Sequence, residues 1–227
     1  MQKEPSRLNA RPGAAREPAP PPGVHALGLS LLKDGLLFVP ASYAPATPAP
    51  FALVLHGAGG NARRALEPLV PLAEAAGLVL LAPDARGPTW DRIWLNGWGP
   101  DVRYIDGALA HAFARLTVDP GHLAVLGFSD GASYALSLGL TNGDLFSHVL
   151  ALSPGFAAPT ALRGAPRVFV SHGVNDPVLP VDRCGRKVAA RLREAGVSVR
   201  YREFDGGHEV PPALQREGLD FFLAPGS

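Results

Sequence analysis

The sequence contains little cysteine, almost no net charge and no long apolar run. Cys184 is the only cysteine among 227 residues, which excludes a disulfide framework and a zinc site built from several cysteines. The formal net charge is +1, too small to indicate a nucleic-acid partner. Four prolines interrupt the longest charge-free segment, residues 35–62, so we expect no membrane-spanning helix.

The remaining composition is that of a folded protein with an unusual N-terminus. Hydrophobic residues make up 47% and charged residues 18% of the chain, which is enough apolar material for a core. Residues 1–25 contain six of the 24 prolines, and their four cationic residues against two anionic ones give a net charge of +2. They lack the apolar run of a secretory signal. We predict a disordered leader over 1–25, a single domain over 26–227 and a cytoplasmic location; a cleaved targeting segment is the alternative for the leader.

Two kinds of pattern follow the leader. Asp34-Gly35 lies between two apolar stretches within 27–39, which predicts an antiparallel hairpin around a tight turn. Six short runs that are almost entirely apolar come next: 51–55, 78–82, 123–126, 148–152, 167–170 and 197–201. Continuous apolarity is typical of parallel strands that are buried on both faces.

Helical patterns separate these runs. Apolar side chains three or four apart predict helices over residues 66–76, 101–116 and 188–195. Asn61 and Asp101 are the expected N-terminal caps, and Gly196 the expected C-terminal cap. The alternation predicts an α/β fold, with a doubly wound, mostly parallel sheet, an N-terminal antiparallel hairpin and helices on both faces. Only residues 153–166 leave room for a lid, so no large lid is expected.

A candidate nucleophile follows one of the predicted strands. In parallel α/β sheets, ligands bind beyond the carboxyl ends of the strands. Gly127-Phe128-Ser129-Asp130-Gly131 follows the run 123–126 and precedes a helical segment that starts at Ala132. Glycines on both sides of a serine allow the sharp turn that exposes a nucleophilic hydroxyl. A Gly/Ser turn without chemistry is the alternative, but the flanking strand and helix favour Ser129 as a nucleophile.

A serine nucleophile needs a base that takes its proton. Three of the seven histidines follow a predicted strand: His56, His172 and His208. His208 lies on a glycine-containing loop after the last strand, and it comes last in the chain, as the order Ser…Asp/Glu…His requires. His208 is therefore the predicted base.

The acid that orients the base is expected at a strand exit as well. Asp176 follows the run 167–170, and Pro177 stiffens the chain after it, so Asp176 is the predicted acid. Asp205 is nearer to His208 in sequence but occupies the position of a turn residue. Asp182 is expected on the surface near the start of a helix. Asp205 and Asp182 remain the less favoured candidates for the acid.

A glycine-rich turn supplies the groups that stabilise a negative oxygen. His56-Gly57-Ala58-Gly59-Gly60 follows the run 51–55, and its glycines let backbone N–H groups face a ligand. The N–H groups of Ala58 and Asp130 are the predicted oxyanion donors, with His56 bracing the loop. A phosphate-binding loop is excluded because no Gly-Lys-Ser/Thr follows and the glycine spacing is wrong.

These motifs occur together with Val118-Asp119-Pro120, His172-Gly173 and Gly206-Gly207-His208. In this combination, residues 26–225 resemble the α/β-hydrolase superfamily, and more narrowly the small esterases of the phospholipase/carboxylesterase and dienelactone-hydrolase-like group. The resemblance implies a triad of Ser129, His208 and Asp176, an acyl-enzyme intermediate, and no cofactor or metal ion. Trp90, Trp94 and Trp98 all lie after the run 78–82, in a loop that borders the nucleophile in related folds. We expect one or two of them to line the substrate pocket, with packing against the helix 101–116 as an equal alternative.

The predicted function is hydrolysis of carboxylic esters with small or short-to-medium acyl groups, with a small-molecule ester as the partner. Dienelactone hydrolases carry cysteine in place of Ser129, and acyl-protein thioesterases typically carry glutamine in place of Asp130, so the resemblance is weaker for these two activities. Lysophospholipase or acyl-thioesterase action and feruloyl-type ester cleavage are the competing enzymatic hypotheses. A non-catalytic binding protein on the same fold is the hypothesis from a different class. The sequence predicts no particular oligomeric state.

Overall fold

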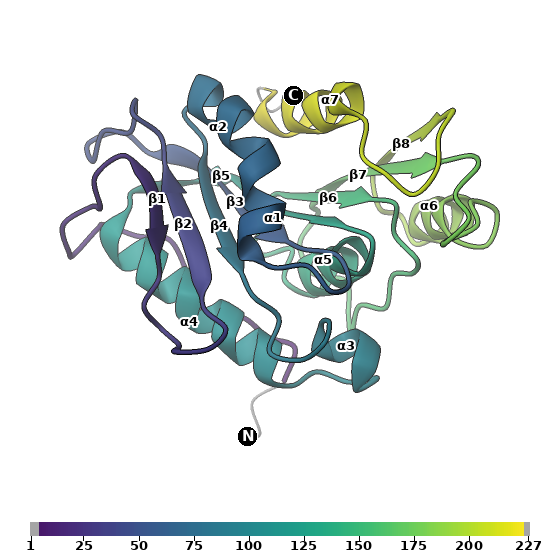
Figure 1. Cartoon of the computed structure of the whole chain (residues 1–227), viewed down its shortest axis with the longest axis horizontal. Coiled ribbons are helices and arrows are strands. Elements are labelled where there is room, and N and C mark those ends of the chain that lie inside the picture. Colours follow the sequence, from purple (N-terminus) through teal and green to yellow (C-terminus); the bar gives the residue numbers. More distant parts are fainter. Residues whose placement is uncertain (1–4, 225–227) are drawn as a thin grey trace.

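The computed structural model describes residues 5–224. Eight strands in this part of the chain form one sheet in the order β1-β2-β4-β3-β5-β6-β7-β8 (Figure 1). Their bounds are β1 Gly23–Ala26, β2 Gly35–Val39, β3 Ala49–Leu55, β4 Val79–Pro83, β5 Val118–Phe128, β6 His148–Leu152, β7 Arg167–Gly173 and β8 Val199–Phe204. The pairs β1/β2 and β2/β4 are antiparallel, and the other neighbours are parallel. The predicted sheet type is confirmed.

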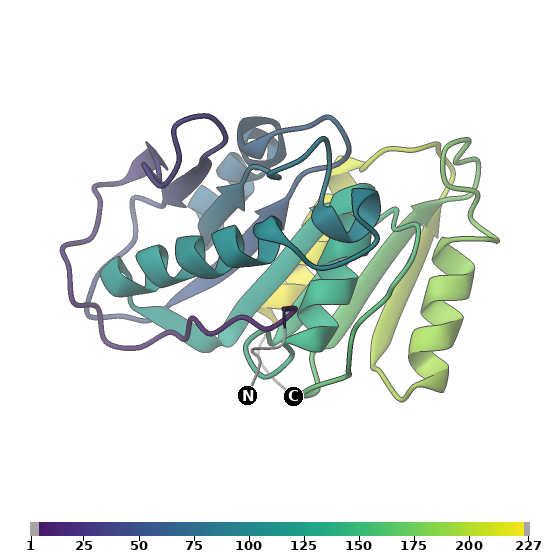
Figure 2. The same cartoon turned by 90° about the horizontal axis from the view of Figure 1, so that it is seen from below.

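Helices cover both faces of this sheet (Figures 1 and 2). One face carries α1 (Ala62–Leu66), the 3₁₀ turn η1 (Glu67–Leu69), α2 (Val70–Ala76) and α7 (Pro212–Leu223). The other carries α4 (Pro100–Arg115), α5 (Asp130–Thr141) and α6 (Gly185–Glu194), and α3 (Asp91–Trp94) lies in the connection after β4. Within residues 5–224, no helix is long and apolar enough to cross a membrane.

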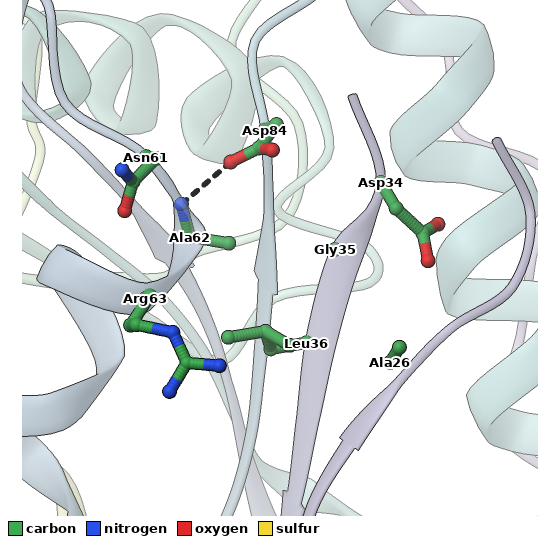
Figure 3. A pocket seen from close by; sticks show the side chains of 8 residues that line it. All are labelled: Ala26, Asp34, Gly35, Leu36, Asn61, Ala62, Arg63 and Asp84. Carbon is green, nitrogen blue, oxygen red and sulfur yellow. Dashed lines mark hydrogen bonds between the residues drawn. The ribbon is translucent and has the colours of Figure 1, made fainter. Parts of the chain in front are cut away.

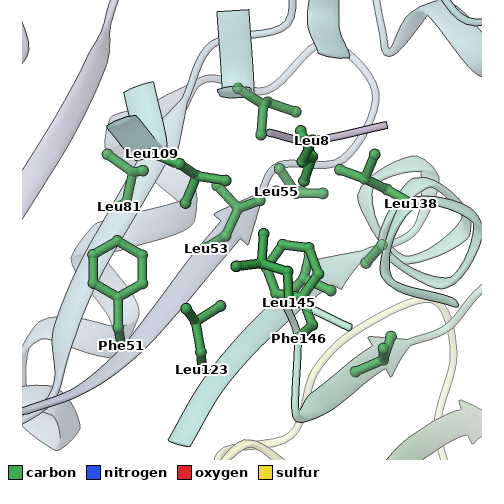
Figure 4. Packing of buried hydrophobic residues seen from close by; sticks show 14 of the residues in the cluster. Leu8, Phe51, Leu53, Leu55, Leu81, Leu109, Leu123, Leu138, Leu145 and Phe146 are labelled. Carbon is green, nitrogen blue, oxygen red and sulfur yellow. The ribbon is translucent and has the colours of Figure 1, made fainter. Parts of the chain in front are cut away.

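Successive side chains of one strand enter two different cores. Leu53 and Leu55 of β3 belong to the core under α4 and α5, whereas Ala52 and Val54 belong to the core under α1 and α7. Figure 4 shows the first core, where Leu53 and Leu55 lie near Leu109 of α4. Burial of both strand faces explains why inner strands such as β4 and β6 are buried throughout. The prediction of a doubly buried strand is wrong for the last run, because β8 lies at the edge of the sheet, contains charged residues and is alternately exposed.

The hairpin is confirmed in kind, but its bounds differ from the prediction. β1 ends at Ala26, so residues 27–34 form a loop rather than a strand and a tight turn. The Asp34 carboxylate holds this loop by accepting hydrogen bonds from the backbone N–H groups of Gly28 and Leu29, at 2.6 and 3.0 Å. Side-chain capping of this kind favours an irregular loop over a strand.

Two of the three predicted caps are found. The Asn61 side chain accepts a hydrogen bond from the N–H of Arg64 at the start of α1, and Gly196, with a φ of +80°, follows the end of α6. The prediction for Asp101 is wrong. α4 begins at Pro100, and the Asp101 carboxylate accepts hydrogen bonds from the N–H groups of Arg86 and Asp91, both at 2.6 Å. Asp101 therefore holds the preceding loop instead of capping the helix.

Residues 5–25 differ from the predicted disordered leader, whose first four residues lie outside the described part. The Leu8 side chain is 1% exposed and belongs to the core under α4 and α5 (Figure 4). Arg7 forms a bidentate pair with Asp144 at 2.8 and 2.7 Å, and Asp106 accepts hydrogen bonds from two backbone N–H groups of the segment. Proline prevents a regular helix here, but it does not prevent an extended segment from packing along α4 (Figure 2).

Candidate active site

Ser129 lies on a sharp turn between β5 and α5. Its φ is +57°, a conformation that residues other than glycine rarely adopt. The flanking glycines permit the turn through close backbone approach. A Cβ atom on Gly131 would lie 2.2 Å from the carbonyl oxygen of Leu55, and one on Gly127 would lie 2.2 Å from that of Gly131. The strained turn holds a nearly buried hydroxyl at the carboxyl end of the strand.

Three side chains from distant parts of the chain meet at this turn. His208 Nε2 lies 2.8 Å from Ser129 Oγ, and His208 Nδ1 lies 2.7 Å from Asp176 Oδ2. An ionised carboxylate only accepts hydrogen bonds, so Nδ1 carries the proton and Nε2 is free to accept one from the serine hydroxyl. The ring of Phe128 packs 4.8 Å from the His208 ring. The structure thus brings the three predicted triad residues together.

Asp176 is held by hydrogen bonds to both of its carboxylate oxygens. Oδ1 accepts from the backbone N–H groups of Val178 and Leu179, at 2.9 and 2.8 Å. Burial alone raises the pKa of Asp176, but these N–H groups and the His208 ring outweigh it, and the pKa is lowered overall. His172 Nε2 lies 3.4 Å from Asp176 Oδ2 and 2.7 Å from the carbonyl oxygen of Leu179. The carboxylate is therefore ionised and fixed in direction.

The two less favoured acids have other partners. Asp205 accepts a hydrogen bond from the side chain of Asn175 at 2.9 Å. Asp182 pairs with Arg186 at 2.7 Å on an exposed face. The carboxylate that hydrogen-bonds to the His208 ring is that of Asp176.

The glycine-rich turn after β3 lies against the nucleophile. A Cβ atom on Gly57 would lie 3.4 Å from the Cβ of Ser129, and the N–H of Gly60 donates to the carbonyl oxygen of Gly57 at 3.0 Å. That bond closes a turn around Ala58. Asp130 is the first residue of α5, so its N–H is one of the donors that a helix leaves without an intrahelical partner. The loop of Ala58 and the start of α5 therefore meet at Ser129.

His56 braces this turn, as predicted. Its Nε2 accepts a hydrogen bond from the N–H of Ala85 at 3.0 Å, and its Nδ1 donates to the carbonyl oxygen of Gly57 at 2.8 Å. Burial lowers the pKa of His56, which keeps the ring neutral in this arrangement. Trp90 Nε1 donates to the carbonyl oxygen of His56 at 2.8 Å. The turn is thereby tied to the loop after β4.

The three tryptophans have different environments. Trp90 has no exposed surface and stacks on Tyr134, with 5.2 Å between ring centroids. It packs in the core together with residues of α4 instead of lining a pocket, which is the packing alternative for this residue. Trp94 is 47% exposed, and Trp98 Nε1 donates to Thr160 Oγ1 at 3.0 Å. For these two residues, a role in substrate binding stays a prediction.

Thr89 makes a contact that the sequence did not suggest. Its hydroxyl donates to Asp130 Oδ2 at 2.7 Å, which links the loop after β4 to the residue that follows the nucleophile. No motif identifies this pair in the sequence, because its two members lie 41 positions apart and only the tertiary fold joins them.

Two cavities lie near the carboxyl ends of the strands. One, of about 460 Å³, is lined by Gly57, Ala58 and Phe128, and so borders the nucleophile turn. The other, of about 290 Å³, is an open notch between β2 and the start of α1, with Asp34 and Asp84 at its edges (Figure 3). Ser129 itself lines neither cavity, but only the larger of the two is lined by its neighbour Phe128 and by the oxyanion turn, so the larger cavity is the one next to the site. Among residues 5–224, no three His, Cys, Asp or Glu side chains are arranged to hold a metal ion.

A serine, a histidine and a buried carboxylate beside a glycine-rich turn on this sheet define the α/β-hydrolase class of serine esterases. The chain belongs to the phospholipase/carboxylesterase family, which matches residues 102–218. It is an enzyme of the carboxylesterase type that hydrolyses carboxylic esters.

Known proteins agree with this assignment. Feruloyl esterase C of Emericella nidulans is 29% identical over 247 residues, which cover 94% of this chain and 87% of the relative. The crystal structure of esterase PE8 superimposes with a TM-score of 0.68 at 20% identity, over 84% of this chain and 98% of the other. The substrate-bound fluorophosphonate-binding serine hydrolase FphF of Staphylococcus aureus gives a TM-score of 0.71 at 14% identity, over 91% and 100%. At these identities the two structures demonstrate the fold.

Proposed function

We propose that Ser129 is the nucleophile of this esterase, His208 its base and Asp176 the acid that orients the base. The observation that carries the proposal is the 2.8 Å contact between His208 Nε2 and Ser129 Oγ. Ser129 Oγ attacks the ester carbonyl carbon while its proton passes to Nε2. The carbonyl oxygen becomes negative and accepts hydrogen bonds from the N–H groups of Ala58 and Asp130.

The second half of the reaction uses the same groups. The protonated His208 donates its proton to the oxygen of the departing alcohol, which leaves the acyl group on Ser129. Water then gives a proton to Nε2 and attacks the acyl carbon, and the acid leaves as the serine takes its proton back. Asp176 stabilises the imidazolium that forms in each half, because its pKa is lowered and it stays ionised.

The proposed substrates are esters with small or short-to-medium acyl groups. A feruloyl-type ester is the second candidate, because Feruloyl esterase C aligns with 94% of this chain. Lysophospholipids and acyl thioesters are less favoured candidate substrates, and a cytoplasmic location stays a prediction. Methyl ferulate, p-nitrophenyl esters from acetate to palmitate, a lysophospholipid and an acyl thioester separate these substrates.

Labelling with a fluorophosphonate probe tests the nucleophile directly. We expect the wild type to be labelled and to hydrolyse p-nitrophenyl acetate, and Ser129→Ala to do neither. Ser42→Ala removes an exposed hydroxyl and serves as the matched control, with labelling and rate at the wild-type level. A wild type that neither labels nor hydrolyses, or a Ser129→Ala variant that keeps its activity, contradicts the proposal.

A further inference from the structure

The cavity of about 460 Å³ beside the oxyanion turn lies between two helical segments on one face of the sheet. Its floor is formed by Val54 of β3, Leu126 of β5 and Leu152 of β6, whose side chains all belong to the core on this face. One wall comes from α1 and η1, and the opposite wall from Val210 and the start of α7. Figure 1 shows α1 and α7 on the same side of these strands. We call this cavity the α1/α7 pocket.

The lining of the α1/α7 pocket is almost entirely apolar. Ala65, Pro68 and Leu69 line the α1 side. His56 contributes a polar ring, but both of its nitrogens already have hydrogen-bond partners. An apolar cavity of a few hundred Å³ next to reactive groups has the character of a small-molecule site.

The remaining polar side chains of the pocket, Arg64 and Gln215, come from the two opposite walls. Arg64 is exposed and Gln215 half-buried, so both of these lining residues are accessible to solvent. Each side chain carries N–H donors. A ligand oxygen at the solvent end of the pocket would therefore meet donors from both walls, while the inner part of the ligand meets only apolar groups.

The position of the α1/α7 pocket decides which half of an ester fits it. The lining includes Gly57 and Ala58 of the oxyanion turn and Phe128 beside the nucleophile, whereas Ser129 and His208 are not among the lining residues. The alcohol oxygen must lie against His208 Nε2 to receive its proton. The group that extends along the oxyanion turn, away from the His208 ring, is the acyl group.

We propose that the α1/α7 pocket binds the acyl group of the substrate and selects an acyl group that is apolar along its length and carries an oxygen at its far end. A phenylpropenoyl group with a ring hydroxyl has this chemistry: a flat apolar body, and an oxygen that meets the donors of Arg64 and Gln215. The proposal rests on Ser129 being the nucleophile of the esterase, and it adds where the acyl group lies and which acyl group is preferred.

Filling the α1/α7 pocket from either wall tests the proposal. Ala65→Trp and Gln215→Trp place a large ring in the pocket from α1 and from α7. Ala213→Trp adds the same ring at an exposed position of α7 that does not line the pocket, and it is the matched control. The measured quantity is the ratio of kcat/KM for methyl p-hydroxycinnamate to kcat/KM for methyl acetate. The two substrates share the alcohol and differ only in the acyl group.

We expect both filled variants to lower this ratio by roughly tenfold or more, since loss of one pocket contact changes specificity by such factors, and the control to keep the wild-type ratio. A ratio that stays at the wild-type value in both filled variants overturns the proposal. A second arm compares benzyl acetate with methyl acetate. If filling the pocket lowers that ratio instead, the pocket binds the alcohol and the acyl assignment is wrong. Fluorophosphonate labelling of each variant distinguishes these results from failure of the nucleophile, which would abolish labelling and all ester hydrolysis in the wild type.

Discussion

The direction of the His208 ring depends on one carboxylate. Asp176 Oδ1 is held by two backbone N–H groups, which leaves Oδ2 aimed at His208 Nδ1. An acceptor at this place requires the proton on Nδ1, and only that tautomer leaves Nε2 able to accept the proton of Ser129. Ser129 can therefore give its proton to His208 only if the Asp176 atom that faces His208 Nδ1 is a hydrogen-bond acceptor.

Asp176→Asn reverses this requirement. The amide oxygen can keep the bonds from Val178 and Leu179, so the amide nitrogen faces His208 Nδ1 and donates to it. The proton then moves to Nε2, where it points at Ser129 instead of accepting from it. We expect kcat for p-nitrophenyl acetate to fall by roughly 10³- to 10⁴-fold, with little change in KM, measured by steady-state kinetics.

Asp205→Asn and Asp182→Asn are the controls for this variant, because these carboxylates bind Asn175 and Arg186 and not His208. Both should keep kcat within about twofold of the wild type, as expected for substitutions away from the reacting groups. Equal losses in Asp205→Asn and Asp176→Asn would show that Asp176 has no special role.

The residues brought together at Ser129 could be predicted from the sequence because each follows the end of an apolar run. Parallel strands place their carboxyl ends at one edge, so Ser129, Asp176 and His208 needed no tertiary information beyond strand order. The environment of Trp90 could not be predicted. α3 has only four residues, and the burial of Trp90 depends on Tyr134 of a different helix, which no local pattern encodes.

At the scale of elements, a row of hydroxyls on α5 fixes the segment that follows β6. Ser133, Ser137 and Thr141 are spaced by four and lie on one face of the helix. Their hydroxyl oxygens accept hydrogen bonds from the N–H groups of Gly155, Ala158 and Thr160, at 2.9, 3.0 and 3.0 Å. This is the segment in which the sequence left room for a lid, and three regular bonds hold it against the helix.

Ser137→Ala removes the middle bond of this row. The Ser137 hydroxyl has no exposed surface, and its loss leaves the N–H of Ala158 without its partner. We expect the free energy of unfolding to fall by about 1–3 kcal/mol, the usual effect of an unpaired buried polar group. Urea denaturation measures it, and Ser42→Ala at an exposed position is the control. Equal midpoints for the two variants would show that the row does not hold the segment.

Helices and strands could also be predicted where the local sequence determines them, and not where distant contacts do. The buried parallel strands β4 and β6 are almost entirely apolar, so their positions were recovered to within one residue at each end, whereas β5 begins five residues before the predicted run because its first part is polar and partly exposed. The whole of β1 was missed, because it lies before the predicted hairpin of 27–39, directly after Pro20 to Pro22, and because the exposed Leu31 and Leu32 resemble strand residues. The loop that contains these leucines is held by the Asp34 carboxylate, which accepts hydrogen bonds from its backbone N–H groups.

At the scale of the whole molecule, the N-terminal segment and helix α7 each pack against one of the two cores. The N-terminal segment inserts Leu8 into the core under α4 and α5, and α7 covers the opposite face with Phe221 and Phe222. His148 lies at the start of β6 beneath α7, with its ring 5.6 and 5.2 Å from those two aromatic rings. The surface of the sheet on which α7 packs therefore includes a titratable side chain, that of His148.

His148 makes the stability of the folded chain dependent on pH. Its side chain is 5% exposed, and burial, followed by the charges of Arg167 and His122, lowers its pKa from 6.5 to about 4. Between these two values the unfolded chain binds a proton that the folded chain does not. The free energy of unfolding therefore falls as the pH drops below 6.5, and the loss is complete below about pH 4.

His148→Phe removes this proton uptake while keeping an aromatic ring against Phe221 and Phe222. In the wild type, the pKa shift of His148 lowers the free energy of unfolding by about 2 kcal/mol between about pH 7 and about pH 5. The variant should lose correspondingly less over this interval, whatever its stability at pH 7. His56 and His111, whose pKa values burial also lowers, keep part of the dependence in both proteins. Urea denaturation of both proteins at the two pH values measures the difference. If the wild type and the variant lose the same free energy, the acid sensitivity of the molecule lies elsewhere than in the docking of α7.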